Sequence, residues 1–343
     1  MKHLLNTLYV TTQGSYLHRA GETVAVRVES ETKIRVPIHT LGGIVCFGQV
    51  SCSPPAMGLC AERGVGLSFL TEYGKFLARI EGPVSGNVLL RREQYRRAGI
   101  DGERLEIARA AVAAKIANGR HVLLRAARER SEGEERSELK TAAGEMGRIL
   151  SRLEGAGSVD VVRGFEGDAA RVYFGAFDHL LTAQKEEFAF RGRSRRPPLD
   201  NINALLSFFY TLLAHDVVGA VSAVGLDPAV GYLHSDRPGR PGLALDLMEE
   251  LRPMIADRLA LSLVNRRQVE GKGFEKSDSG GVVMDEKTRK KVLVAYQKRK
   301  QEEMLHPFLG EKIAVGLLPH VQAMLLARHL RGDLDAYPAF FWR

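Results

Sequence analysis

The sequence predicts an α+β fold, in which a small N-terminal β-rich domain over residues 1–90 precedes a larger all-α C-terminal domain over residues 91–343. Three observations support this prediction. The chain has 343 residues, more than one typical domain of about 100–200 residues needs. Short apolar runs separated by turn residues fill the first part. Alanine-rich sequence with helical spacing begins after Gly99–Gly102.

The N-terminal domain contains a series of strand-like segments. TVAVRVES (Thr23–Ser30) and KIRVPI (Lys33–Ile38) alternate apolar and polar residues, and GGIVCFG, GVGLSFL and KFLARIEG follow as short apolar runs. We expect these segments to form antiparallel strands. Between them, Ser53–Gly64 predicts a short helix that begins at the serine and its prolines and ends at the glycine.

All three cysteines, Cys46, Cys52 and Cys60, lie in this domain. Their spacing does not match a zinc site, so we interpret them as small buried hydrophobic residues. The odd number of cysteines and the absence of a signal-peptide pattern favour a reducing, cytoplasmic setting. No run of about 18 or more apolar residues predicts a transmembrane helix.

Helical patterns dominate the rest of the chain. Residues 129–154 mix both charge signs and predict a solvated helical hairpin. Gly164–Leu181 predicts an amphipathic helix, and Asn201–Gly225 is apolar nearly all round, as is typical of a central buried helix. Gly271–Gly281 is interpreted as a mobile loop, and Asp285–Glu303 as a helix with a basic exposed face. In the amphipathic helix the residues expected to face inward are Phe165, Ala169, Val172 and Phe177.

The charge balance is basic, with 49 Lys and Arg against 41 Asp and Glu and a net charge of +8. Such a balance favours an anionic partner, such as nucleic acid or a membrane surface. One basic cluster, RGRSRR (Arg191–Arg196), fits either a contact to a nucleic-acid backbone or a solvated loop.

The segment GYLHSDRPGRPGLALDLMEELRP contains a candidate metal site. Asp246 and Glu249 are three residues apart and therefore share one face of a helix. Their surroundings are apolar, and a buried carboxylate needs a cation or another partner. With His234 they form a ligand set that suits Mg²⁺ or Mn²⁺. Each residue by itself is more simply a surface residue.

Glu166 is a second candidate acid, at the start of an apolar-faced helix. It either binds a metal or complements the positive N-terminus of that helix. Because it is distant from His234 in the sequence, spacing alone does not bring the two together. Three arginines, Arg237, Arg240 and Arg252, flank the proposed site and suit phosphate oxygens, although RPGRP also fits a solvated connector.

At these residues the sequence closely resembles the CRISPR-associated adaptation integrases, the Cas-one family. The matching pieces are GFEGDAARVYF, RPPLDNINALLSFFYTLL, GYLHSDRPGRPGLALDLMEELRP and LLARHLRGDLDAYPAF, which occur in the family's order. The resemblance covers nearly the whole chain. The sequence around HPFLGEK and LRGDLDAYPAF is most similar to that of the branch found with type I-C systems.

The resemblance implies a role for each candidate residue. By motif the family's metal ligands fall on Glu166, His234 and Glu249, and the same three residues are catalytic. Many relatives carry Asp at the third position, where this chain has the longer carboxylate of Glu249. Asp246 is the nearby acid and is expected to support the ligands. Arg237, Arg240 and Arg252 are expected to bind DNA, and the cofactor is expected to be Mg²⁺ or Mn²⁺.

The implied function is spacer acquisition. A short fragment of foreign double-stranded DNA, the prespacer, is inserted into the CRISPR repeat when its 3′-hydroxyl attacks a repeat phosphodiester. The family works as homodimers bridged by a Cas-two protein, with the β-rich domain as the dimerisation surface. In type I-C-like systems a Cas-four nuclease helps to trim the fragments.

Other functions fit parts of the pattern. The same ligands would serve a stand-alone metal-dependent nuclease that acts on branched DNA. A non-catalytic DNA-binding scaffold of a defence complex and an RNA-binding protein with a structural metal are further alternatives. The aromatic tail DAYPAFFWR is expected to pack on the helical domain, or else to contact a partner or DNA.

Overall fold

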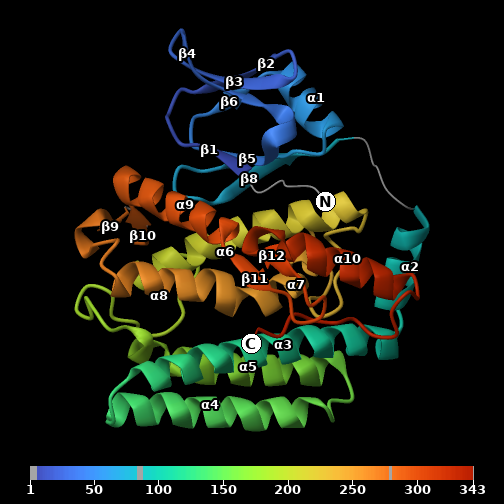
Figure 1. The fold of residues 1–343 in the computed structure, drawn as a ribbon, viewed down its shortest axis with the longest axis vertical. Helices are drawn as coiled ribbons and strands as arrows, with labels where there is room; N and C mark the ends of the chain where they lie inside the picture. The colour runs from blue at the N-terminus through green and yellow to red at the C-terminus, as the bar shows by residue number, and fades with distance from the viewer. Residues whose placement is uncertain (1–5, 83–87, 278–279, 343) are drawn as a thin grey trace. The chain divides into compact units, whose positions relative to one another are not determined.

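The computed structural model describes residues 6–82, 88–277 and 280–342, and its contacts divide the chain into two compact units (Figure 1). The first unit combines Met1–Gly86 with Arg289–Gln301, and the second combines Asn87–Thr288 with Glu302–Arg343. The segment Arg289–Gln301 therefore groups with the N-terminal strands, although it follows most of the helical region in the sequence.

Two four-stranded sheets and one helix form the body of the first unit. Their order is β1-β5-β7-β8 in one sheet and β4-β3-β2-β6 in the other. The elements are β1 (Asn6–Val10), β2 (Tyr16–Ala20), β3 (Thr23–Val28), β4 (Glu31–Pro37), β5 (Leu41–Phe47), β6 (Ser51–Cys52), α1 (Pro54–Glu62), β7 (Gly66–Leu70) and β8 (Phe76–Ile80).

The expectation of purely antiparallel strands is wrong for three pairs. β5 runs parallel to both β1 and β7, and β6 runs parallel to β2. Parallel neighbours need a crossover connection, and α1 supplies it between β5 and β7. This helix begins as predicted, because the Ser53 hydroxyl accepts a hydrogen bond from the Ala56 N–H (3.3 Å).

The cysteines are part of the apolar core of this unit, as predicted. Cys46 and Cys60 are buried, Cys52 is partly buried, and all three are free thiols. Burial raises the pKa of Cys46 and Cys52 to about 12 and that of Cys60 to about 11. The thiols are therefore protonated at neutral pH and behave as small apolar side chains.

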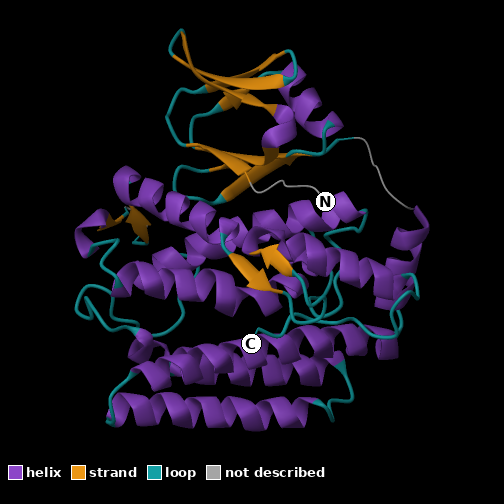
Figure 2. Ribbon diagram, in the orientation of Figure 1, coloured by secondary structure: helices purple, strands orange, loops and turns teal. Residues whose placement is uncertain are grey.

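Helices make up most of the second unit, which confirms the predicted fold class (Figure 2). The long α3 packs against α4, α5 and α7, and α6 packs against α7, α8 and α10. The helices are α2 (Val88–Ala98), α3 (Asp101–Glu129), α4 (Glu134–Leu153), α5 (Val159–Gly175), α6 (Asn201–Val224), α7 (Gly242–Arg252), α8 (Arg258–Asn265) and α10 (Leu318–Leu330). The helix α9 (Glu286–Gln301) crosses the boundary between the units.

Two predicted helical features differ from the structure. The solvated hairpin expected within residues 129–154 is wrong: most of that range forms one helix, α4, which packs against α3 and buries one face that includes Leu139, Met146 and Ile149. α5 starts at Val159, earlier than predicted, because Ser158 caps it. A 3₁₀ turn replaces the end of the predicted helix after Gly175.

α6 is the predicted central helix. Asp200 accepts a hydrogen bond from the Asn203 N–H (2.7 Å) at its start, and Gly225 ends it with a φ of 92°. Within the described residues it is the one helix whose length and composition would allow it to cross a membrane. Its contacts with α7, α8 and α10 make it the core helix of this unit.

The interpretation of Gly271–Gly281 as a mobile loop is wrong for its described part. Phe274–Lys276 (β9) pairs antiparallel with Val282–Met284 (β10), and residues 278–279 lie outside the described chain. A second hairpin joins β11 (Glu303–Leu305) to β12 (Lys312–Ala314). Both hairpins are too short to show a clear alternation of apolar residues, so the sequence did not reveal them.

α7 continues into α8 through a wider turn. Pro253–Asp257 form one π-helical turn between the two helices. Because proline has no N–H, it cannot continue the regular hydrogen-bond ladder of α7. The turn separates Glu249 and Arg252, which precede it, from Asp257, which ends it.

We expect Ser158→Ala to lower the free energy of unfolding by about 1 kcal/mol, because the Ser158 hydroxyl accepts a hydrogen bond from the Val161 N–H at the start of α5. Urea denaturation followed by circular dichroism measures the change. Ser151→Ala is the matched control, since Ser151 lies exposed inside α4, where alanine is a good helix former. An equal loss in both variants would contradict the capping role.

Candidate functional site

Three helices of the second unit bring two of the predicted acids together. Glu166 extends from α5, Glu249 from α7, and both contact one lysine, Lys115, from α3. The Lys115 Nζ lies 2.6 Å from Glu249 Oε2 and pairs directly with Glu166 Oε1. An ammonium group therefore occupies the position between the two carboxylates.

Glu249 has a second cationic partner. Arg252 Nη1 lies 2.9 Å from Glu249 Oε1, three residues further along α7. The Glu249 side chain is only 4 % exposed, so both ion pairs are largely shielded from water. Burial opposes its ionisation, yet the charges of Arg252, Lys115 and His234 together lower the pKa of Glu249 below its usual range. Glu249 is therefore ionised at neutral pH.

His234 lies in the connection between α6 and α7, and Asp246 fixes its orientation. Its Nδ1 is 2.7 Å from Asp246 Oδ1. The carboxylate of Asp246 also accepts hydrogen bonds from the backbone N–H groups of Tyr232 (2.5 Å), Leu233 (2.9 Å) and His234 (3.0 Å). With Nδ1 engaged, Nε2 of His234 is the ring nitrogen suited to bind a metal or substrate.

Two glycines make this arrangement possible. A Cβ on Gly231 would lie 2.7 Å from Asp246 Oδ2 and 2.7 Å from the carbonyl carbon of Gly242. A Cβ on Gly242 would lie 2.7 Å from the Ala229 carbonyl oxygen. Only glycine lets these two backbone segments approach closely enough for Asp246 to reach the three N–H groups.

Residues of α2 and α3 hold the loop that leads to His234. The buried Gln94 side chain donates to the carbonyls of Asp227 (2.8 Å) and Val230 (2.9 Å), and its oxygen accepts from the Asp227 N–H (2.9 Å). Arg104 Nε donates to the Tyr232 carbonyl (2.7 Å). The position of the imidazole is therefore set by contacts to two helices outside its own segment.

The three predicted arginines have different surroundings. Arg237 is exposed in the loop after His234, and Arg240 beside it is half-buried. The Arg252 side chain is only 18 % exposed, pairs with Glu249 and lies over the Tyr210 ring, 4.8 Å from its centroid. The structure thus directs Arg252 to the acid and the aromatic ring, whereas Arg237 projects to solvent.

A buried polar cluster adjoins Arg252. Asp257 accepts hydrogen bonds from the hydroxyls of Tyr210 (2.6 Å) and Tyr173 (3.0 Å). Burial raises the pKa of Asp257 to about 6, against the opposing effect of these hydrogen bonds and of Arg252 and Arg193. Arg193, from the basic RGRSRR cluster, is also placed over the Tyr210 ring (5.2 Å) and bonds Asn203. This arginine of the cluster is therefore partly buried and bonded to protein groups.

The candidate ligands have the right chemistry for a divalent cation, but they are not arranged as a ligand set. No group of three His, Cys, Asp or Glu side chains lies in metal-binding geometry within residues 6–82, 88–277 and 280–342. Two carboxylate oxygens that already share one cation, and an imidazole whose charge acts on Glu249, are donor types that suit Mg²⁺ or Mn²⁺. Lys115 is the side chain that would have to withdraw.

Sequence reasoning missed Lys115, Gln94 and Arg104. A signal for the first was present, because Lys115 is a lone charge in the apolar run AVAAKIA and a buried lysine needs an acidic partner. Gln94 and Arg104 had no such signal, since they act through backbone groups more than 100 positions away.

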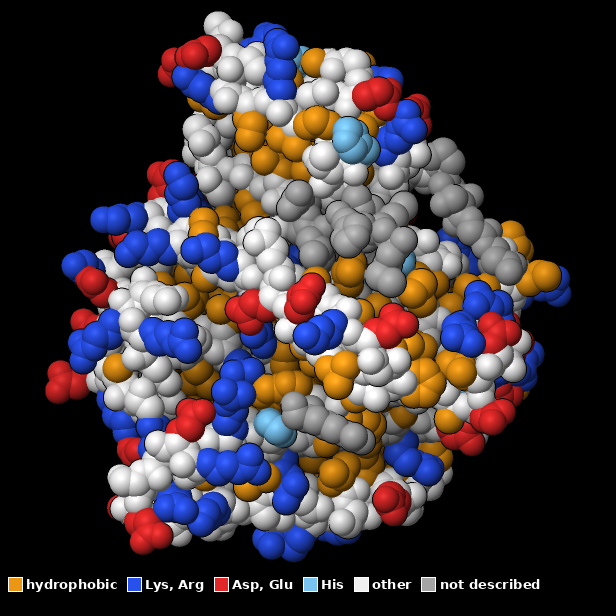
Figure 3. All heavy atoms as spheres, viewed as in Figure 1, with side chains coloured by type: hydrophobic (Ala, Val, Ile, Leu, Met, Phe, Trp, Pro, Cys, Tyr) orange, Lys and Arg blue, Asp and Glu red, His pale blue; other side chains and the backbone are white. Residues whose placement is uncertain are grey.

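Carboxylates, an imidazole and neighbouring arginines are the side-chain types of metal-assisted enzymes that act on phosphodiesters. Separately from this site, α9 presents four exposed lysines, Lys287, Lys290, Lys291 and Lys298. Figure 3 shows Lys and Arg side chains gathered over this helix.

Comparisons with known proteins agree with this class. The family described as CRISPR associated protein Cas1 matches residues 8–298. A CRISPR-associated endonuclease Cas1 from Chlorobaculum tepidum is 54% identical over 343 residues, and one from Rhodospirillum rubrum is 52% identical over 347 residues; both alignments cover all of each chain. The chain therefore belongs to the Cas1 family of endonucleases and integrases, which confirms the resemblance seen in the sequence.

A longer relative and the solved structures extend the comparison. A Cas4/Cas1 fusion from Rhodospirillum rubrum is 35% identical over 97% of this chain and 57% of its own length. A Cas1 protein from Thermotoga maritima has a TM-score of 0.84 at 25% identity, covering 97% of this chain and 99% of its own. The same fold occurs in a casposase bound to an integration product (TM-score 0.84, 22% identity, 98% and 94% covered). It also occurs in a Cas6-RT-Cas1–Cas2 complex (TM-score 0.82, 20% identity, 98% and 36% covered).

We expect Lys115→Met to lower the free energy of unfolding by about 2 kcal/mol in the presence of a chelator, because two adjacent carboxylates lose their shared cation. Added Mn²⁺ should then raise the melting temperature more in the variant than in the unmodified protein, because lysine no longer competes for the carboxylates. Thermal unfolding with EDTA and with Mn²⁺ measures both effects. Lys140→Met, at an exposed position on α4, is the control and should show neither. Equal responses to Mn²⁺ in all three proteins would argue against a cation position at Lys115.

Proposed function

We propose that this protein is the integrase of CRISPR spacer acquisition and that Glu166, His234 and Glu249 form its metal-dependent catalytic site. The observation that carries the proposal is the ionised, buried Glu249, which shares a cation with Glu166. The imidazole of His234, which Asp246 orients, acts electrostatically on the same Glu249. Family membership supports the class of reaction, and the side-chain geometry supports the residues.

The reaction is a transesterification of DNA. The oxygen of a prespacer 3′-hydroxyl forms a bond to a phosphorus of the repeat, and the bond from that phosphorus to its original 3′-oxygen breaks. The attacking hydroxyl loses its proton, and the departing oxygen gains one. A bound Mg²⁺ or Mn²⁺ would supply polarisation of the phosphate and stabilise the charge on the leaving oxygen. With water in place of the hydroxyl, the same site cuts DNA.

The protein's own residues then have separate tasks. Glu166, Glu249 and His234 Nε2 would hold the cation, and Asp246 keeps the imidazole oriented through its contact with Nδ1. Arg237 and Arg240 would bind backbone phosphates near the break. Arg252, paired with Glu249, would serve the ligand more than the DNA.

Partners follow from the same proposal. A Cas2-family protein is supported by the related Cas1–Cas2 complex, and a Cas4-family nuclease by the related Cas4/Cas1 fusion. Double-stranded DNA is the substrate, as both prespacer and repeat. We further propose that the protein forms a homodimer through the N-terminal domain, residues 1–90, and that residues 91–343 form the catalytic domain. We also propose that it belongs to the type I-C-like branch and is located in the cytoplasm.

We expect His234→Ala to abolish both strand joining and DNA cutting, because the variant loses a metal ligand. The protein should stay folded, because His234 lies in a loop between helices. The assay combines the protein, with and without its Cas2 partner, a labelled duplex with 3′-hydroxyl ends, a supercoiled plasmid carrying leader and repeat, and Mn²⁺ or Mg²⁺. Label joined to the plasmid reports integration. A 3′-blocked duplex is the substrate control, and a His234→Ala protein that still joins DNA would refute the assignment.

The same assay separates the alternatives. Cutting of plasmid or duplex that never leads to joining would identify a stand-alone nuclease. DNA binding with no metal-dependent chemistry would identify a scaffold.

Asp246→Asn should reduce joining by about 10–100-fold, as is typical when a partner of a metal-binding histidine is lost. The amide of asparagine cannot accept all of the four hydrogen bonds that the carboxylate receives. Joining rates at several Mn²⁺ concentrations test this, since a misoriented histidine should raise the Mn²⁺ concentration needed for half-maximal rate. Asp236→Asn, at an exposed position two residues after His234, is the control. An unchanged metal requirement in Asp246→Asn would exclude the positioning role.

A further inference from the structure

The C-terminal segment lies across the helices that carry the candidate site. The Phe340 N–H donates to Glu250 Oε2 (2.5 Å), and the Tyr337 hydroxyl donates to Glu250 Oε1. The Trp342 N–H donates to Asn118 Oδ1 (2.7 Å). The segment is thus bonded to α7 through Glu250 and to α3 through Asn118.

The side chain of Asn118 joins α3, α7 and the C-terminal segment. Its Nδ2 donates to the Glu250 carbonyl of α7 (2.7 Å) and to the Phe340 carbonyl of the segment (2.8 Å), while its Oδ1 accepts from Trp342. The side chain is fully buried, and these bonds use both donors and its oxygen. Loss of the amide would leave two carbonyls and one N–H without this partner in a dry environment.

Both anchors are next to residues of the site. Asn118 follows Lys115 by three positions on α3, so the two lie on the same face of that helix. Glu250 follows Glu249 directly on α7, and consecutive residues point about 100° apart. Glu249 faces the lysine, whereas Glu250 faces Gln322 of α10 (3.3 Å) and the C-terminal segment. A rotation or shift of α7 against α3 would therefore change the contacts of Glu249 with Lys115 and those of Glu250 with the C-terminal segment at once.

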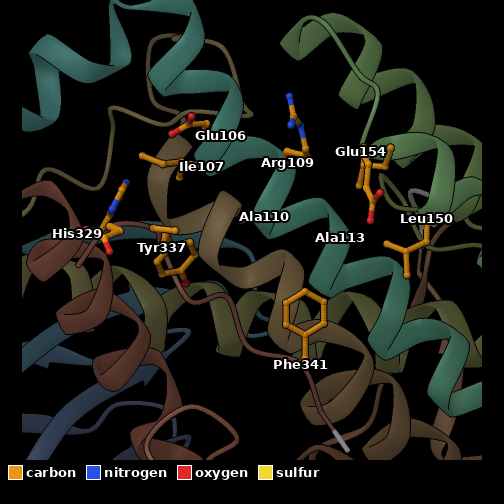
Figure 4. Close-up of a pocket in the computed structure, with 13 residues that line it drawn as sticks. Glu106, Ile107, Arg109, Ala110, Ala113, Leu150, Glu154, His329, Tyr337 and Phe341 are labelled. Atoms are coloured by element: carbon orange, nitrogen blue, oxygen red, sulfur yellow. The ribbon is translucent and has the colours of Figure 1, made fainter.

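The segment is held both by these hydrogen bonds and by packing, because Tyr337 and Phe340 are buried. Tyr337 and Phe341 form part of the wall of a cavity of about 490 Å³, opposite Ala110 and Ala113 of α3 (Figure 4). The centroids of the Trp342 and His121 rings are 4.3 Å apart, and the Arg258 guanidinium lies over the Trp342 ring, 4.6 Å from its centroid. None of the candidate ligands lines this cavity. The hydrogen bonds at Asn118 and Glu250 join the segment directly to α3 and α7.

We propose that residues 337–342 are a positioning element of the metal site. Asn118 and Glu250 are its positioning residues: they hold α7 on α3, against which α5 also packs, so that Glu249 of α7 and Glu166 of α5 can share one cation. This inference rests on the proposed function, because it assigns the segment a task in that same site. It accounts for the burial of a second acid, Glu250, directly beside Glu249.

The test is the affinity for Mn²⁺, measured by electron paramagnetic resonance on the full-length protein at a temperature where each variant is folded. We expect Asn118→Ala to weaken Mn²⁺ binding by about 10–100-fold, the range found for residues that orient metal ligands. Tyr337→Phe removes a single hydroxyl and should weaken binding by a smaller factor, which keeps the test valid if Asn118→Ala does not fold. Asn203→Ala is the matched control, because Asn203 is equally buried and bonded but anchors the start of α6.

The outcomes are distinct. Weaker Mn²⁺ binding in the Asn118 and Tyr337 variants, with unchanged binding in a similarly destabilised Asn203→Ala, supports the positioning role. Unchanged binding in the Asn118 and Tyr337 variants overturns it, while the proposed function stands. Glu249→Ala shows whether the measured site is the proposed one. If that variant binds Mn²⁺ as tightly as the unmodified protein, the catalytic assignment fails and the positioning role fails with it.

Discussion

Removing a carboxylate from water costs several kcal/mol unless a cation lies beside it, and the helical unit is organised around that requirement at Glu249. Lys115 comes from α3 and Arg252 from α7, and Glu166 from α5 contacts the same lysine. Three helices must therefore meet within hydrogen-bonding distance of one acid. Three other features adjoin this one ion-pair cluster. They are the π-helical turn after Arg252, the tyrosines that bond Asp257, and the hydrogen bonds of the C-terminal segment to Glu250.

Much of the fold was predictable because its signals are local. Ser53, Asp200 and Gly225 mark helix ends through their own side chains or backbone angle, and the apolar surface of α6 indicated its central place. Strand direction was not predictable, since β1 pairs with β5 across about 30 intervening residues and no local pattern distinguishes a parallel neighbour. The burial of Tyr337 and Phe340 agrees with the expected packing of the tail. Its bonding partners on α3 and α7 could not be read from nine residues.

The site was predictable in part, and for a different reason. His234 and Asp246 lie close together in the sequence, and the glycines and arginines between them indicated a shaped loop. Glu166 was recognisable as a candidate acid, but its place beside the other candidates came only through the family resemblance, because nothing in its own surroundings points to α7. Lys115 was recognisable as an isolated charge but had no identifiable partner, since its contacts depend on how α3, α5 and α7 pack. The roles of these residues in catalysis stay predictions.

The composition of the first unit affects how the chain folds during its synthesis. Its strands are complete by Ile80, but the same compact unit includes Arg289–Gln301. Within it, Lys300 Nζ contacts the Thr7 hydroxyl (3.2 Å) and Arg289 Nη2 lies 3.4 Å from Glu72. A ribosome delivers about 5–20 residues per second, so the N-terminal unit waits on the order of ten seconds or more for its last helix. The earliest part of the nascent chain is thus among the last to reach its final form.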